Sequence, residues 1–120
     1  MSKPRSPRMR RVNELLREIV AEEATELKDP RIGFLTITGV NTAPNLRNAI
    51  VYYSVIGDDE QHERTAAALS SAAKRFQAVI GSQTRLKYTP VLEFRLDPSI
   101  DEGLRMDRLL QELHEKEENR

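Results

Sequence analysis

The sequence contains no cysteine among its 120 residues. Disulfides, thiolate metal sites and cysteine nucleophiles are therefore excluded, and the absence is typical of proteins from a reducing compartment. Long apolar runs are missing too, because the longest, over residues 49–56, is interrupted by Ser54 and is far shorter than the roughly 20 residues of a membrane helix. No apolar signal-peptide core follows the basic N-terminus. We therefore expect a cytoplasmic protein without a membrane segment.

Residues that could support catalysis are equally sparse. The only histidines, His62 and His114, lie far apart in polar surroundings, and no metal ligands recur at a fixed spacing. The serines lack nucleophile-elbow glycines, and no glycine-rich phosphate loop with a lysine is present. The adjacent carboxylates Asp58 and Asp59 are typical of a helix start, where acids cap the helix and favour its dipole. The sequence therefore predicts a protein that is not an enzyme and uses no metal or cofactor.

What the chain does have is an uneven distribution of charge. Its 19 basic and 19 acidic residues cancel, yet residues 1–11 carry five bases and no acid, and a second basic cluster spans residues 74–95. If the two segments meet as one positive face, that face favours a polyanion such as RNA, because neutralising phosphates releases counterions whatever the base sequence. The alternative is a set of ordinary solvated side chains. The residues predicted to contact RNA phosphates are Arg8, Arg10, Arg11, Lys74, Arg75, Arg85 and Lys87.

The first half of the chain predicts a helix followed by a hairpin. Ser6 and Pro7 can cap and open a helix whose apolar residues recur at helical spacing to about residue 28, and Asp29-Pro30 ends it. Strand formers then occupy residues 32–40 and 46–56 on either side of a turn. The sequence predicts that these two strands pair antiparallel.

The second half predicts a helix and one more strand. Helix formers cover residues 59–80, and Gly81 is a natural stop that opens a loop. Apolar and polar residues alternate over 86–96, which indicates a half-buried strand. Pro90 lacks a backbone donor, which indicates an edge position or a bulge, so we expect this strand to bend at Pro90 or to pair regularly only after it.

The C-terminal part predicts a short helix and a tail. A capping box starts at Ser99, and Met106, Leu109, Leu110 and Leu113 follow at helical spacing. Residues 114–120 have no apolar side chain and are predicted to be disordered.

Helix, strand, strand, helix, strand is the order of an α+β domain whose helices pack on a three-stranded sheet. Small folds with this order include the KH domains of prokaryotic type, which bind nucleic acid. The length and hydrophobic content predict one domain, over residues 1–113.

Five short motifs narrow the choice of protein family. Each motif alone is common, but their order and spacing are specific. They are Arg10-Arg11-Val12, Asp29-Pro30-Arg31-Ile32, Asn45-Leu46-Arg47-Asn48-Ala49-Ile50-Val51-Tyr52, Pro90-Val91-Leu92-Glu93-Phe94, and Asp97-Pro98-Ser99 followed by Gly103-Leu104-Arg105-Met106 and Leu109-Leu110. Over about residues 8–113 the chain resembles the bacterial ribosome-binding factor A family.

The resemblance implies a KH-like fold and a non-enzymatic role in ribosome biogenesis, often linked to growth in the cold. It implies binding to the immature small (30S) subunit and its 16S rRNA near the neck and decoding region, and help with processing of the RNA 5′ end. The implied partners are the small subunit, assembly GTPases and other maturation factors. Nothing in the sequence demands a dimer, and we expect a monomer.

One departure from the family concerns the second helical segment. The family has an Ala-x-Gly kink there, and the matching residues here are Ala72-Ala73-Lys74. Lysine favours a helix over glycine by about 1 kcal/mol, which predicts a straighter helix unless packing bends it. Lys74 can instead add a phosphate-binding charge at that point.

Two other functions remain open at the level of sequence. One is a general KH-type binder of single-stranded RNA. The other is a protein-interaction module in which the acidic C-terminal segment and the carboxylates of the first helix dock on a basic partner, and RNA is incidental. Tyr52, Tyr53 and Tyr88 can in principle stack on bases, but tyrosines in strands more often pack across a sheet.

Overall fold

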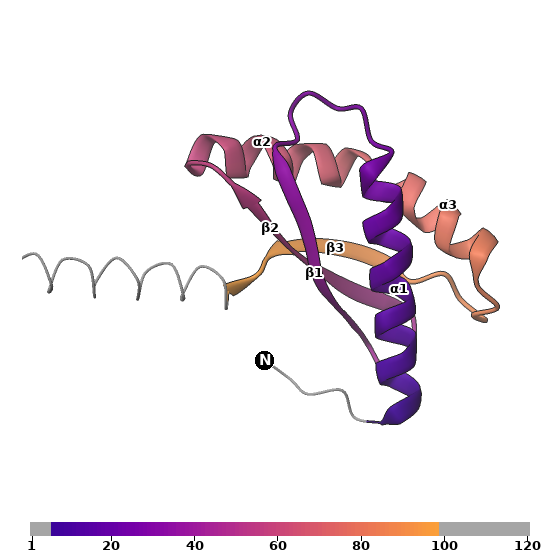
Figure 1. Ribbon diagram of the computed structural model, residues 1–120. Coiled ribbons are helices and arrows are strands. Elements are labelled where there is room, and N and C mark those ends of the chain that lie inside the picture. Colours follow the sequence, from indigo (N-terminus) through magenta and orange to yellow (C-terminus); the bar gives the residue numbers. More distant parts are fainter. Residues whose placement is uncertain (1–5, 99–120) are drawn as a thin grey trace, which may run out of the picture.

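The computed structural model describes residues 6–98, and the C-terminal helix predicted over 99–113 and the tail over 114–120 lie outside them (Figure 1). Three helices and three strands follow one another here. Their order is the predicted helix, strand, strand, helix, strand, except that the second helical segment is divided in two. The elements are α1 (Pro7–Thr25), β1 (Phe34–Thr42), β2 (Asn48–Ile56), α2 (Asp59–Ser71), α3 (Ala73–Gln83) and β3 (Val91–Leu96).

Helix α1 begins where the sequence predicts. The Ser6 side chain accepts a hydrogen bond from the Met9 N–H at 3.1 Å, and Pro7 occupies the first turn, where its missing donor costs nothing. The helix ends at Thr25, earlier than the predicted residue 28. It closes with a tight turn in which the Glu26 N–H donates to the Glu23 carbonyl at 3.0 Å. Residues 26–33 therefore form a longer connection than expected.

The sheet has the order β1-β2-β3. The predicted hairpin is confirmed, because β1 and β2 pair antiparallel from Phe34 opposite Ile56 to Thr42 opposite Ala49, with an irregularity between Ile37 and Gly39. β2 and β3 pair parallel. β3 begins at Val91, directly after Pro90, as the proline predicted; residues 86–89 precede the strand, so that part of the predicted strand was wrong.

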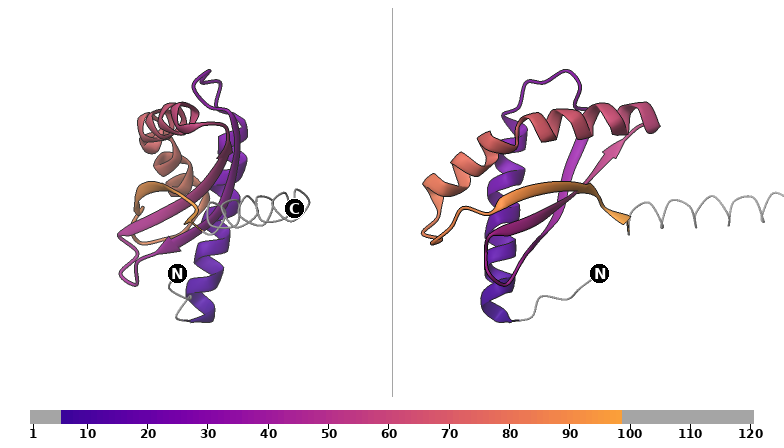
Figure 2. Two further views of the ribbon diagram at one scale, coloured as in Figure 1. Left: turned by 90° about the vertical axis from the view of Figure 1, so that its left-hand side faces the viewer. Right: turned by 180° about the vertical axis from the view of Figure 1, so that it is seen from behind.

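The helices cover one face of the sheet. Every second residue of β2 is buried, and its neighbours are partly or fully exposed. The buried set forms one core with residues of β1, β3 and all three helices. Figure 2 shows that α1 and the α2–α3 pair cross each other, with the junction of α2 and α3 near the C-terminal part of α1. The core residues include Leu16, Ile19, Val20, Val51, Tyr53, Leu69, Phe76, Ile80 and Leu92.

The predicted single helix over 59–80 is in fact two helices, which meet at Ala72. The Ser71 hydroxyl donates to the Ala67 carbonyl at 3.0 Å, a back-bond of the kind that bends helices. The Ala72 N–H is shared between two carbonyls, from Ala68 and Leu69, both at 3.1 Å, which tightens the turn. The chain thus breaks at the position of the family kink without its glycine, and Lys74 becomes the second residue of α3.

The predicted stop at Gly81 was also wrong, because α3 continues to Gln83 and ends at Thr84. Gly81 has a different use. A Cβ at this position would lie 3.1 Å from Oγ1 of Thr89, so the missing side chain allows the segment before β3 to approach α3 closely.

Candidate nucleic-acid interface

Arginines crowd the first turns of α1. Arg8, Arg10 and Arg11 are exposed, and the first turn of this helix contains no acid. Within residues 6–98 none of the three forms an ion pair. Bases at a helix N-terminus oppose the macrodipole by about 0.3 to 1 kcal/mol each, so this placement does not serve the helix itself.

Asn13 ties this part of α1 to the sheet. Its Oδ1 accepts a hydrogen bond from the backbone N–H of Thr42 at 2.8 Å, and both residues are buried. Thr42 is the last residue of β1. The turn between β1 and β2 is therefore held beside the N-terminal half of α1 (Figure 1).

The turn over residues 43–47 has a fixed shape. Leu46 adopts a left-handed backbone with φ of 62°, and its N–H donates to the Ala43 carbonyl at 2.8 Å. Oδ1 of Asn45 accepts from the Arg47 N–H at 3.0 Å. A left-handed conformation is unfavourable for leucine, and the surrounding hydrogen bonds hold it in place. This geometry fixes where Arg47 leaves the turn.

Arg47 connects the turn to the segment before β3. Its carbonyl accepts from the Val91 N–H at 2.9 Å, and its guanidinium carbon lies 4.3 Å from the centroid of the Tyr88 ring. Nζ of Lys87 lies 5.5 Å from the same ring. Both cations are exposed, and both lie within the range of cation–π attraction. Arg85 is exposed in the same segment.

Three stretches of chain thus bring cations to one end of the molecule, which we call the basic end. It comprises Arg8, Arg10 and Arg11 of α1, Arg47 of the turn, and Arg85 and Lys87 before β3. Sequence reasoning missed Arg47, although the residue lies inside the motif over residues 45–52. Its proximity to Tyr88 depends on the parallel pairing of β2 with β3, which periodicity does not reveal.

Lys74 and Arg75 lie elsewhere. Nε of Arg75 is 2.6 Å from Oε1 of Glu23, near the C-terminal end of α1. Glu23 is 13 residues beyond Arg10, which corresponds to about 20 Å along the helix axis. These two predicted residues therefore form a second basic position, and the charge of Arg75 is already paired there.

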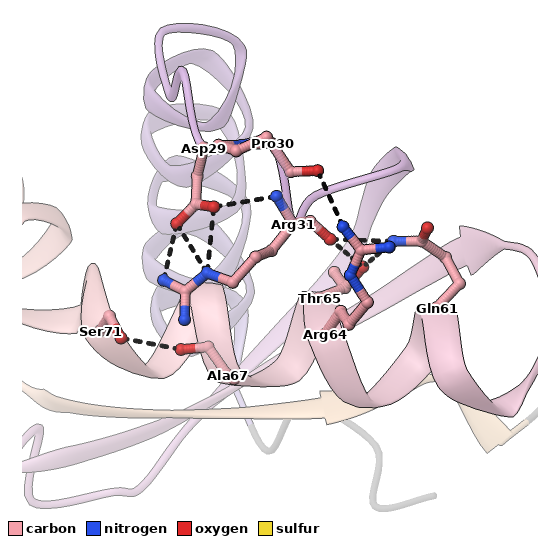
Figure 3. Close-up of polar contacts among 8 residues, drawn as sticks. All are labelled: Asp29, Pro30, Arg31, Gln61, Arg64, Thr65, Ala67 and Ser71. Atoms are coloured by element: carbon pink, nitrogen blue, oxygen red, sulfur yellow. Dashed lines mark hydrogen bonds and ion pairs between the residues drawn. The ribbon is translucent and has the colours of Figure 1, made fainter.

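A hollow of about 710 Å³ lies beside this second position. Its apolar lining includes Leu27 and Ala72, and Lys28, Arg31 and Arg75 also line it. The Arg31 guanidinium is engaged by Asp29 with Nη2 to Oδ2 at 2.7 Å, and the Arg31 carbonyl accepts from the Gln61 side-chain amide at 2.9 Å (Figure 3). The Asp29–Arg31 pair shapes the loop after α1, and the bond from Gln61 attaches this loop to α2.

The Asp29–Arg31 pair gives a prediction about pH. Hydrogen bonds from Arg31 lower the pKa of Asp29 from 3.8 to about 2. A lowered carboxyl pKa means that the pair stabilises the folded chain fully above pH 3.8, and that this stabilisation is lost as the pH falls towards 2. We expect NMR titration of the Asp29 carboxyl to give a midpoint near 2, and R31Q to return it towards 3.8. An unchanged midpoint in R31Q would show that another group lowers the pKa.

The tyrosines differ in exposure. Tyr53 is 2% exposed in the core, and burial raises the pKa of its hydroxyl. It is therefore closed to stacking on RNA bases. Tyr88 is 38% exposed and lies beside Arg47 at the basic end.

Other site types have no counterpart in the described part of the chain. Over residues 6–98, no three side chains among His, Cys, Asp and Glu gather closely enough to hold a metal ion. None of the helices there is both long and apolar enough to cross a membrane.

An α+β domain with a three-stranded mixed sheet, a broken helix before the last strand and an exposed basic end belongs to the KH-like class of small domains. The expected fold class is thereby confirmed. The sequence profile described as ribosome-binding factor A matches residues 8–110. The chain belongs to the ribosome-binding factor A family.

Similar proteins agree with this assignment. Ribosome-binding factor A of Geobacter sulfurreducens is 46% identical over 107 residues, which cover 88% of this chain and 91% of that protein. The crystal structure of ribosome-binding factor A from Thermus thermophilus is 28% identical and superposes with a TM-score of 0.67, covering 73% of this chain and 94% of that one. A Thermus thermophilus ribosome-binding factor A fitted into the cryo-EM map of a 30S complex is 30% identical with a TM-score of 0.58, covering 69% and 88%.

Proposed function

We propose that this protein is a non-enzymatic assembly factor that binds the immature small ribosomal subunit in the cytoplasm. It acts there as a monomer and assists maturation of 16S rRNA, including processing of the 5′ end. The basic end contacts rRNA phosphates and orients the protein on the subunit, and specificity comes from the shape of the folded RNA. Assembly GTPases and other maturation factors act with it.

The observation that carries this proposal is the convergence of cations from three separated segments. Asn13 holds the turn beside α1, and Arg47 meets Tyr88 from the segment before β3. Arg8, Arg10 and Arg11 have no acidic partner within residues 6–98, so these three charges are available for phosphates. The 30S complex of the Thermus thermophilus relative supports the same partner.

Co-sedimentation with ribosomal particles tests the proposal. The purified protein is mixed with precursor small subunits, mature small subunits and large subunits across a salt series. We expect binding to favour small subunits or their precursors and to weaken steeply as salt rises. Equal binding to all three particles, or none, would contradict the proposal.

Two variations of the experiment separate the alternatives. Excess unrelated single-stranded RNA should not displace the protein from precursor subunits, whereas it would displace a general RNA binder. Deletion of residues 114–120 should leave subunit binding nearly unchanged. A large loss on deletion would favour a protein-interaction module that docks through its acidic end.

A further inference from the structure

The face of the sheet opposite the helices carries large apolar side chains. Phe34 of β1 and Ile56 of β2 are directly opposite each other in the register, and they are 81% and 76% exposed. Tyr52 lies on the same face, because Tyr52, Ser54 and Ile56 are alternate residues of β2. Neighbouring exposed side chains of this size form an apolar patch that favours a covering element.

The chain leaves β3 at this face. Glu93 and Arg95 of β3 are exposed on the side opposite the buried Leu92, and Asp97 continues their alternation. The Asp97 carboxylate accepts a hydrogen bond from Oγ1 of Thr38 in β1 at 2.7 Å. Since β2 lies between β1 and β3, this side chain spans the central strand on the open face.

The backbone at Asp97 is held as well. Its N–H donates to the Tyr53 carbonyl at 2.7 Å, next to the end of β2 that carries Ile56. The two bonds fix where the following segment starts. That starting point lies beside the strand ends that carry Phe34 and Ile56.

The sequence that follows has a matching apolar stripe. Met106, Leu109, Leu110 and Leu113 recur at i, i+3, i+4 and i+7, with charged residues between them. A stripe of this kind is stable as a helix in water only when it packs against another surface.

We propose that residues 99–113 of the same chain dock on the open face of the sheet, with their leucines against Phe34, Tyr52 and Ile56. Eight residues from Pro98 to Met106 reach about 12 Å as a helix and about 26 Å extended, whereas neighbouring strands are about 4.8 Å apart. The tether gives the segment a high effective concentration at this face. The basic end stays uncovered, because Phe34 and Ile56 lie at the opposite end of the strands from the turn that carries Arg47.

Paramagnetic relaxation provides the test. Because the chain has no cysteine, Glu112→Cys gives a single attachment site for a nitroxide in the full-length protein. We expect the amide signals of Phe34, Tyr52 and Ile56 to lose most of their intensity, and those of Arg8 to Arg11 to keep theirs. The double variant L109E/L110E should restore the signals of the open face.

The control variant Gln111→Glu/Asn119→Glu adds the same two charges outside the apolar stripe and should leave the intensity loss unchanged. Unaltered signals from α1 and from the core strands check that each variant stays folded. Uniform or absent broadening would overturn the proposal, because the label would then not be held at the open face.

A mixing experiment distinguishes a second copy from the chain's own segment. Protein that carries the nitroxide but no isotope is added to isotope-enriched protein that carries no nitroxide. Intensity loss at Phe34 in this mixture would show docking between copies and would overturn the intramolecular proposal. The intramolecular proposal is supported if signals in the mixture are undiminished and signals are lost when the nitroxide and the isotope are in the same chain. Co-sedimentation of the chain ending at residue 98 with small subunits separates this inference from the proposed function. Retained binding would support the proposed function independently of what covers the open face.

Discussion

Reversing the charge of Arg10 and Arg11 should weaken binding to small subunits by about thirtyfold at about 0.15 M salt, if the two affinities become equal at about 1 M salt. Each lost phosphate contact lowers the slope of log K against log salt by about 0.9, so the double variant R10E/R11E should have a slope smaller by about 1.8. Both side chains are exposed, so the fold should persist. Co-sedimentation across the salt series measures the affinity and the slope.

A matched control separates local contact from net charge. The double variant K28E/R64E makes the same change in total charge, and both residues are exposed towards the other end of α1, near the loop that follows it. We expect this variant to lose far less affinity than R10E/R11E. Equal losses in the two variants would remove the start of α1 from the interface and would leave only a general attraction between charges.

Replacing Phe76 by alanine should destabilise the domain by about 3 to 5 kcal/mol. The side chain is fully buried where α3 meets the sheet, and its ring centroid lies 5.3 Å from that of Phe94 in β3. The change removes the contact between the two rings and leaves a cavity. Since small domains have about 5 to 15 kcal/mol of stability in total, F76A should unfold at a much lower urea concentration.

Lys74→Ala is the comparison for this variant. It also shortens a long side chain of α3, but at an exposed position, so the expected change is within about 0.5 kcal/mol. Urea unfolding followed by circular dichroism gives both values. Similar midpoints for F76A and K74A would mean that the core does not depend on the packing of α3 against β3.

Local signals in the sequence predicted the elements whose causes are local. Ser6 and Pro7 located the start of α1, because capping involves only the next three residues. Pro90 located the start of β3, because a missing donor acts at its own position. The hairpin followed from two strand-forming segments joined by a short turn.

Features that depend on distant contacts were predicted less well. The sequence did not predict a definite break at Ala72. Lysine at position 74 favours a helix, whereas the bend comes from Ser71 and from packing. Gly81 reads as a helix stop, yet its use lies in the approach of Thr89. Helix propensity describes neither effect.

The candidate site shows the same division. The bases at the start of α1 are a run in the sequence, and the structure displays them on the surface. Arg47 is a single charge in a turn, and only the three-dimensional fold places it beside Tyr88. Arg75 belongs to a basic cluster in the sequence, but its contact with Glu23 places it near the C-terminal end of α1.

If the basic end binds rRNA as proposed, the way it is assembled couples RNA binding to protein stability. Its cations come from residues near 10, 47 and 86, and their placement at one end of the molecule depends on the Asn13–Thr42 bond and the β2–β3 pairing. A partner that binds this arrangement and not the unfolded chain stabilises the native state by mass action. The protein should therefore resist heat and proteolysis better on the subunit than off it, and the subunit would act as a reversible ligand that sets how long each copy survives.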